Sequence, residues 1–264
     1  MTPHARERLD AWIAARRRAG RMLVAVDYDG TLAPIVARPE AAALAPGSRR
    51  VLERLAARPD TDLAVISGRA LEDVRARVAL EGVFYGGNYG MELEGPGVEH
   101  VYEPAAAIRP RLTALAAALR ERLAGIDGAI VEDKGLTLSV HYRLVAGPDG
   151  EARVRERVDS LCAGAAGIRL SSGKKVVEIR PDVAWDKGRA VRFLLHALRI
   201  AEGSLVPVVF IGDDESDEEA FRALAGIGDG VLVAESPAER SAAVAWLRGP
   251  DEVASLLLDL ADAA

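Results

Sequence analysis

Residues 22–31 read MLVAVDYDGT: five apolar residues are followed by two aspartates two positions apart and then by Gly-Thr. An apolar run of this length is typical of a buried strand in a parallel sheet. Asp27 would then lie at the end of the strand, the edge at which open α/β sheets bind ligands. Because side chains alternate along an extended chain, we expect Asp27 and Asp29 to point the same way. Two adjacent carboxylates repel each other unless a cation lies between them or one is protonated, so this stretch indicates a metal site, an acid–base pair, or both.

The composition limits the classes of protein to which the chain can belong. Its 264 residues are half apolar, which is enough for one large domain or two smaller ones. A net charge of −6 argues against a general nucleic-acid-binding protein, which usually carries a basic surface. The single cysteine, Cys162, cannot form a disulfide within the chain and fits a reducing compartment. With no apolar run of about 18 residues and no signal-peptide centre, we expect a cytoplasmic protein that binds neither membranes nor nucleic acid.

Apolar runs alternate with stretches of helical periodicity in two parts of the chain. We expect strands at 22–26, 63–69 and 230–234, a strand and a glycine-rich turn over 83–93, and a strand, an acidic turn and a helix start over 205–221. Helices are expected near the N-terminus and at 47–58, 70–80, 188–201 and 250–262. This alternation is typical of a parallel sheet with helices on its faces. The sequence therefore predicts an α/β core domain made of residues 1–104 and 182–264.

The pattern between these two parts is different. A helix at 105–124 precedes the strands AIVED and LTLSVHYR, and a helix at 150–165 precedes the strands IRLSSG and KVVEIRP. Two α-β-β units of this kind form a small antiparallel sheet with helices on one face. We therefore expect an inserted α+β domain over residues 105–181.

The strands of the insert alternate between apolar and polar positions. The apolar set is Leu136, Leu138, Val140, Tyr142, Val177 and Ile179, and the opposite set is Thr137, Ser139, His141, Arg143, Val176, Glu178 and Arg180. One face of the sheet is thus predicted to pack on the helices, and the other face could close over a polar ligand.

Four segments with reactive side chains lie where strands end or helices begin. They are Asp27-x-Asp29-Gly30-Thr31, Ser67-Gly68-Arg69, Lys187, and Gly212-Asp213-Asp214-x-x-Asp217. Each alone is common in turns or helix caps. Their combination on these elements indicates phosphoryl transfer, in which a carboxylate nucleophile divides hydrolysis into two steps through an aspartyl phosphate.

The same chemistry requires a cation, because the phosphoryl group and the neighbouring carboxylates are all negative. Mg²⁺ held by oxygen ligands relieves this repulsion. Asp27 and Asp213 are the strongest ligand candidates, the backbone carbonyl of Asp29 is a third, and Asp217 would face the same site.

Other residues of the four segments would act on the phosphoryl group and on protons. Lys187 would supply a fixed positive charge, and Ser67 with backbone N–H groups would bind phosphoryl oxygens. Asp29 could protonate the leaving sugar oxygen and then deprotonate the attacking water.

Taken together, these segments resemble the haloacid dehalogenase (HAD) superfamily of phosphatases, and the resemblance covers nearly the whole chain. It implies a HAD-like Rossmannoid core with a C2B-type cap inserted between the second and third motifs. It also implies that Asp27 is the nucleophile and Asp29 the general acid and base.

Finer segments resemble the trehalose-6-phosphate phosphatases. They are DYDGTLAPI, SGR, GNYGMELE, EDKGLTLSVHYR, GKKVVEIRP and GDDESDEEAF. In that family a Glu-x-Lys pair and a later Glu of the cap bind the disaccharide, which implies these roles for Glu132, Lys134 and Glu178. The sequence departs from the family at Asn88-Tyr89-Gly90, where relatives often have Asn-His-Gly.

The resemblance implies a Mg²⁺-dependent phosphatase that converts trehalose 6-phosphate to trehalose and phosphate beside a separate trehalose-6-phosphate synthase. The further substrate-binding candidates are Gly68, Arg69, Asn88, His141, Arg143, Lys174 and Asp214, several of which could instead be structural. Alternatives are a phosphatase of another sugar phosphate (of the sucrose 6-phosphate or glycosyl-phosphoglycerate type), a phosphomutase, and a sugar-phosphate sensor that has lost catalysis.

Overall fold

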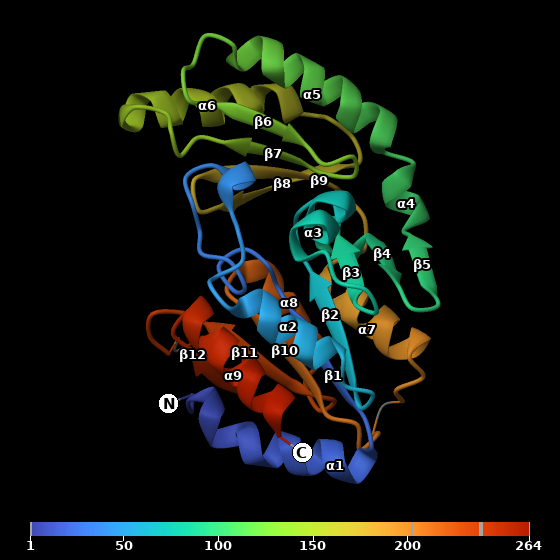
Figure 1. Cartoon of the computed structure of the whole chain (residues 1–264). Coiled ribbons are helices and arrows are strands. Elements are labelled where there is room, and N and C mark those ends of the chain that lie inside the picture. The colour runs from blue at the N-terminus through green and yellow to red at the C-terminus, as the bar shows by residue number, and fades with distance from the viewer. Residues whose placement is uncertain (1, 202, 238–239, 264) are drawn as a thin grey trace. The chain divides into compact units, whose positions relative to one another are not determined.

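The computed structural model describes residues 2–201, 203–237 and 240–263 and divides into two compact units (Figure 1). The first consists of Met1–His100 and Trp185–Ala264, and the second of Val101–Ala184. Each unit has its own sheet and its own apolar core.

The sheet of the first unit has the strand order β12-β11-β10-β1-β2-β3-β4-β5. Pairing is parallel from β12 to β3, and β4 pairs antiparallel with β3. The strands are β1 (Met22–Val26), β2 (Thr61–Ile66), β3 (Phe84–Gly87), β4 (Glu92–Gly95), β5 (Val98–Val101), β10 (Val208–Gly212), β11 (Asp229–Val233) and β12 (Ala245–Leu247). The predicted parallel α/β core is confirmed.

Helices cover both faces of this sheet. They are α1 (Leu9–Ala19), α2 (Ser48–Ala56), α3 (Leu71–Val78), α7 (Lys187–Ala197), α8 (Glu215–Ala223) and α9 (Pro250–Asp262), with short 3₁₀ turns η1 (Ala5–Arg8), η2 (Pro39–Ala41) and η3 (Asn88–Gly90). One core packs α1, α2, α3 and α9 on the sheet, and the other packs α7 and α8. Met22, Val24 and Val26 enter the first core while Leu23 and Ala25 enter the second, which is why β1 is apolar throughout.

The second unit is an antiparallel sheet of order β6-β7-β9-β8 packed on helices. Its elements are α4 (Glu103–Ala106), α5 (Arg109–Leu123), β6 (Ile130–Asp133), β7 (Leu138–His141), α6 (Gly147–Cys162), β8 (Ile168–Gly173) and β9 (Val176–Pro181). Leu138, Val140, Tyr142, Val177 and Ile179 form its core with α5 and α6. The two predicted α-β-β units and their apolar face are confirmed.

The structure differs from the expected elements in three places. The expected helix at 105–124 is two helices, α4 and α5, because Pro110 lacks an N–H and favours the first turn of a helix. Helix α6 begins at Gly147, a turn earlier than expected. The short strands β5 and β12 were not expected, since three or four residues are too few to show a periodic pattern.

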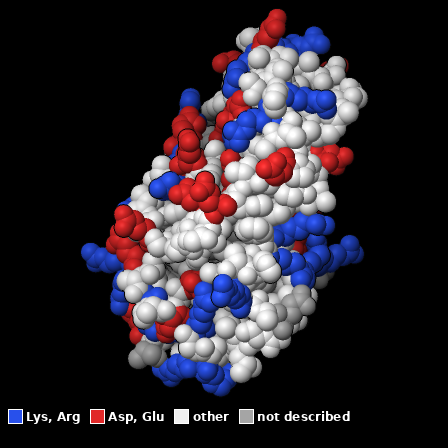
Figure 2. Space-filling view, turned by 90° about the vertical axis from the view of Figure 1, so that its right-hand side faces the viewer, with Lys and Arg blue, Asp and Glu red and all other residues white. Residues whose placement is uncertain are grey.

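The surface carries charges of both signs. Figure 2 shows a face on which Lys and Arg are interspersed with Asp and Glu, in keeping with 34 basic and 40 acidic residues in the chain. Over residues 2–201, 203–237 and 240–263, no helix combines the length and the apolar character that a membrane span requires.

A buried arginine joins α1 to the end of α9. Arg16 is 0% exposed and donates hydrogen bonds to the carbonyl oxygens of Leu260 (2.7 Å) and Ala263 (2.6 Å). Carbonyls in the last turn of a helix have no partner within the helix, and a cation there also complements the helix dipole.

We expect Arg16→Met to lower the free energy of unfolding by about 2–3 kcal/mol, because it leaves these carbonyls without their charged donor. Urea unfolding followed by circular dichroism measures the change. Arg18→Met, an exposed position in the same turn, is the control and should stay within about 0.5 kcal/mol of the unmodified protein. Equal losses in the two variants would contradict this role for Arg16.

Candidate active site

Two aspartates follow neighbouring parallel strands of the first unit. Val26 at the end of β1 is in register with Ile211 in β10, and the N–H of Asp27 donates to the carbonyl of Ile211 (2.8 Å). Asp27 and Asp213, the residues directly after these strands, therefore meet at the carboxyl edge of the sheet. Asp27 is only 5% exposed, whereas Asp213 is partly exposed.

A buried lysine lies between two carboxylates at this edge. Lys187 is the first residue of α7 and is 1% exposed. Its Nζ donates to Oδ1 of Asp27 (2.7 Å) and to Oδ1 of Asp217 (2.6 Å). These two bonds fix both the ammonium group and the carboxyl group of Asp27.

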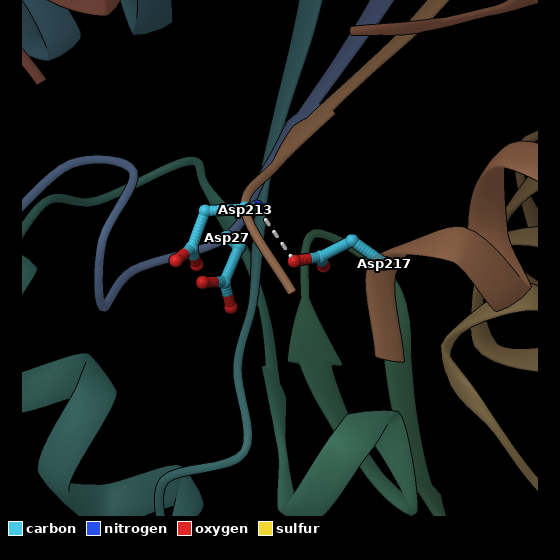
Figure 3. A group of neighbouring side chains, drawn as sticks. All are labelled: Asp27, Asp213 and Asp217. Carbon is cyan, nitrogen blue, oxygen red and sulfur yellow. Dashed lines mark hydrogen bonds between the residues drawn. The ribbon is translucent and has the colours of Figure 1, made fainter. Parts of the chain in front are cut away.

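The start of α8 is organised by a capping box. Oδ1 of Asp214 accepts the backbone N–H groups of Ser216 and Asp217, while Oδ2 of Asp217 accepts those of Asp213 (2.9 Å) and Asp214 (3.0 Å). Figure 3 shows the carboxyl of Asp217 reaching the backbone at residue 213. The carboxyl groups of Asp27 and Asp213 lie next to each other in the same view. Both oxygens of Asp217 thus hydrogen-bond to the protein.

The electrostatics of this cluster follow from its burial. Desolvation raises the pKa of Asp27 to about 7, although the Lys187 ammonium acts in the opposite direction. Desolvation also opposes the charge of Lys187, but the carboxylates of Asp217 and Asp27 outweigh it and raise the lysine pKa. Desolvation opposes ionisation of Asp214 too, yet Lys187 and the bonds from Ser216 lower its pKa to about 2. One ammonium therefore faces more than one carboxylate, and a further cation would be stabilised here.

The residues present fit a hard divalent metal ion. Carboxylate oxygens of Asp27, Asp213 and Asp217 lie within 4.8 Å of one another. Mg²⁺ is usually held by one or two carboxylates and keeps several waters. Gly30 (φ +82°) passes so close that a Cβ on it would lie 2.3 Å from Oδ2 of Asp213, so only glycine leaves room for this carboxylate.

The carboxylates of Asp27 and Asp29 pair with different cationic side chains, Lys187 for Asp27 and Arg69 for Asp29. The strand ends at Val26, and a turn closed by hydrogen bonds from Leu32 and Ala33 to the carbonyl of Tyr28 follows. Asp29 accepts two hydrogen bonds from Arg69, one from Nε and one from Nη2, both 2.7 Å long. The alternation of an extended chain therefore does not reach Asp29.

The segment after β2 is tied to the turn after β3. Ser67 is 1% exposed, and its Oγ accepts the N–H of Arg69 (3.2 Å). Asn88 donates its N–H to the carbonyl of Arg69 (2.6 Å) and its side-chain amide to Glu92 (2.7 Å). The ring of Tyr89 packs on Gly68, where a Cβ would lie 2.9 Å from the tyrosine Cζ.

The second unit gathers polar side chains on neighbouring strands. Glu132 in β6, Ser139 in β7 and Glu178 in β9 are aligned across the sheet. Glu178 accepts from Ser139 Oγ (2.8 and 2.9 Å) and lies 3.4 Å from Lys134 Nζ. His141 Nε2 is 2.8 Å from Oε2 of Glu132. The predicted sugar-binding residues of this unit are thus brought together.

The remaining predicted residues and some unpredicted ones have protein partners. Arg143 donates to the carbonyl of Lys174. The predicted site residues did not include Ser139, Asp73 or Arg77. Asp73 and Arg77 extend the ion pair of Arg69 along α3. The spacing of Arg69, Asp73 and Arg77, four residues apart each time, is the signal that could have found this series.

We expect Gly30→Ala to weaken the binding of Mn²⁺, used as a probe of the carboxylate cluster, by about tenfold, or about 1.4 kcal/mol. The added Cβ would displace the Asp213 carboxylate. Gly82→Ala is the control, because Gly82 also has a positive φ (+74°) but a Cβ added there would meet nothing within 4 Å. Calorimetric titration of both variants measures the affinity, and an unchanged dissociation constant for Gly30→Ala would argue against the site.

Comparisons with known proteins agree with this geometry. A model of the trehalose-phosphatase family matches residues 25–243. A probable trehalose-phosphate phosphatase of Oryza sativa subsp. japonica is 37% identical, covering 95% of this chain and 73% of the relative. A protein of Mycobacterium tuberculosis called an uncharacterized glycosyl hydrolase is 43% identical over 91% of this chain, which spans 18% of that protein.

Solved structures show the same fold. The C-terminal domain of the Candida albicans trehalose-6-phosphate phosphatase superposes with a TM-score of 0.81 at 24% identity, with 100% of both chains covered. The family model covers most of the chain, and the rice relative is similar along nearly all of it. This chain therefore belongs to the trehalose-phosphatase family.

Proposed function

We propose that this protein hydrolyses trehalose 6-phosphate to trehalose and phosphate, with Asp27 as nucleophile and Mg²⁺ as cofactor. The observation that carries the proposal is the buried contact of Lys187 with Asp27, next to Asp213 at the edge of the sheet. A nucleophilic carboxylate, a fixed cation and a metal-binding acid at one strand edge are the groups that phosphomonoester hydrolysis requires.

In the first step an oxygen of the Asp27 carboxylate attacks phosphorus, and the bond from phosphorus to the sugar oxygen breaks. Lys187 holds Oδ1 of Asp27 and so orients the carboxyl group. Asp29 enters this step protonated and donates that proton to the leaving oxygen, because an alkoxide is a poor leaving group. The products of this step are trehalose and a phosphorylated Asp27.

In the second step water attacks the same phosphorus and the bond from phosphorus to Asp27 breaks. The Asp29 carboxylate formed in the first step takes a proton from this water. Ser67 Oγ accepts the N–H of Arg69, which orients the hydroxyl so that it can donate to a phosphoryl oxygen. Phosphate leaves and both aspartates return to their initial states.

Asp27, Asp213 and the carbonyl of Asp29 would hold Mg²⁺, which when bound neutralises charge on the phosphoryl group. Asp217 belongs to the same acidic cluster, but its oxygens accept from Lys187 and from the backbone at 213–214. We therefore assign Asp217 the positioning of Lys187 and of Asp213.

We assign recognition of the disaccharide to Glu132, Lys134 and Glu178. Carboxylate and ammonium groups can pair with several sugar hydroxyls at once, and a site built to bond a hydroxyl rejects analogues that lack it. Ser139 and His141 would orient the two glutamates through the contacts described above. We further propose that the reaction takes place in the cytoplasm and that a separate synthase supplies the substrate.

Asp27→Asn should abolish phosphate release from trehalose 6-phosphate, a loss of about a thousandfold or more, because an amide does not act as the nucleophile. A phosphate-release assay in the presence of Mg²⁺ measures the rate, and circular dichroism checks the fold. Asp10→Asn, the same change at an exposed position of α1, should leave the rate unchanged. Substantial activity in Asp27→Asn would remove this residue as the nucleophile.

Glu178→Gln should lower kcat/KM for trehalose 6-phosphate by about 100-fold and change that for p-nitrophenyl phosphate by less than about threefold, because only the former presents sugar hydroxyls. The control is Glu156→Gln, at an exposed position of α6. A parallel panel with sucrose 6-phosphate tests the substrate itself. Equal losses on both substrates would separate Glu178 from sugar recognition.

A further inference from the structure

We propose that Asp73 and Arg77 are positioning residues that act through Arg69 to hold Asp29 in the orientation for proton transfer. The inference rests on the proposed function, since it concerns the residue to which we assign acid–base catalysis. It is carried by a continuous series of ion pairs that runs from Asp29 through Arg69 and Asp73 to Arg77. Arg77 in turn donates a hydrogen bond to the carbonyl of Ala42.

The ion pair with Arg69 holds the Asp29 carboxylate in place. Its side chain is 42% exposed, and it lies in a turn outside the regular strand. A carboxyl group in such a place would sample several rotamers. The two parallel bonds from Nε and Nη2 of Arg69, each 2.7 Å, define the plane of the carboxylate.

Arg69 is itself fixed on every side. The residue is 5% exposed, and its guanidinium carbon lies 5.2 Å from the centre of the Tyr28 ring. Nη2 also donates to the carbonyl of Pro39 (2.9 Å), and Nη1 donates to Asp73 (2.7 Å). With the bond to Asp73 in place, the guanidinium can make all of these hydrogen bonds in one orientation only.

Arg77 holds Asp73 in turn. Its Nε donates to both oxygens of Asp73 (2.9 Å each), and its Nη1 reaches the carbonyl oxygen of Ala42. Desolvation opposes the charge on Asp73, but Arg77 and Arg69 outweigh it and lower the pKa of this carboxyl. Asp73 is therefore an anion that pairs with two arginines, Arg69 four residues before it and Arg77 four residues after it.

This series should affect catalysis beyond its effect on stability. A general acid or base must lie within hydrogen-bond reach of the proton that it transfers, and small displacements are costly. For an aryl phosphate, the two steps of the reaction depend on Asp29 to different degrees. An aryl phosphate has a good leaving group and forms the phosphorylated Asp27 with little help, but the water step still requires the Asp29 carboxylate.

The test is Asp73→Asn, with Glu72→Gln as its matched control. Both residues are acids in the first turn of α3, so they interact alike with the helix dipole, but Glu72 is exposed. For Asp73→Asn we expect kcat on trehalose 6-phosphate to fall by about tenfold with KM changed less than about twofold. Rapid mixing with p-nitrophenyl phosphate should show a burst that approaches about one p-nitrophenolate per active site. Glu72→Gln should show neither effect.

A second variant keeps the test decisive if Asp73→Asn is poorly folded. Arg77→Gln leaves the Arg69–Asp73 pair in place but removes its anchor, and we expect the same burst with a smaller loss of kcat. Rates equal to those of Glu72→Gln, or a lower melting temperature with no burst in either variant, would overturn the proposal.

The proposed function can fail independently of this inference. If the unmodified protein hydrolyses p-nitrophenyl phosphate but not trehalose 6-phosphate, the substrate assignment is wrong, and the burst measurement still decides the role of Asp73. If Asp27→Asn also retains activity on the aryl phosphate, the assigned mechanism is wrong and the proposed positioning role is overturned with it.

Discussion

The ammonium group of Lys187, buried between the carboxylates of Asp27 and Asp217, ties together the elements that meet at the carboxyl edge of the sheet in the first unit. Taking charged groups out of water is costly, and loss of one partner leaves a buried charge uncompensated. The two ion pairs therefore form only when the start of α7, the start of α8 and the end of β1 have their native positions. Since 160 positions separate Asp27 and Lys187 along the chain, only the completed sheet brings them together.

Two glycines allow the carboxylates at this edge of the sheet to lie close to the backbone. A Cβ at Gly212 would lie 2.1 Å from Cγ of Asp217, and one at Gly30 would meet Asp213. Both glycines thus permit an approach of backbone to carboxylate that any larger residue would prevent. The carboxylates gathered in this way can carry more negative charge than the single ammonium of Lys187 balances, so a divalent cation would be stabilised here.

The sequence predicted those parts of the fold that leave a periodic signal. Strand β1 shows one because both of its faces are buried, and β7 shows another because one face packs on α5 and α6. The ends of elements were less predictable. Turn geometry decides that Asp29 leaves the strand direction, and a contact across 40 positions decides that Arg69 holds it. The sequence pattern therefore selected Asp29 and gave Arg69 as a substrate-binding candidate that could instead be structural, and the structure shows this arginine hydrogen-bonded to Asp29, Asp73 and the carbonyl of Pro39.

Strand β1 has a consequence for how this protein can be studied. All five of its residues are 0% exposed, and parallel strands β2 and β10 flank it. Deuterium can replace its amide protons only when the first unit opens as a whole, whereas loops and helix ends open locally. Native-state hydrogen exchange at β1 would therefore report the global stability of this unit without any substrate, and would separate damage to the scaffold from damage to the chemistry in any variant of the site.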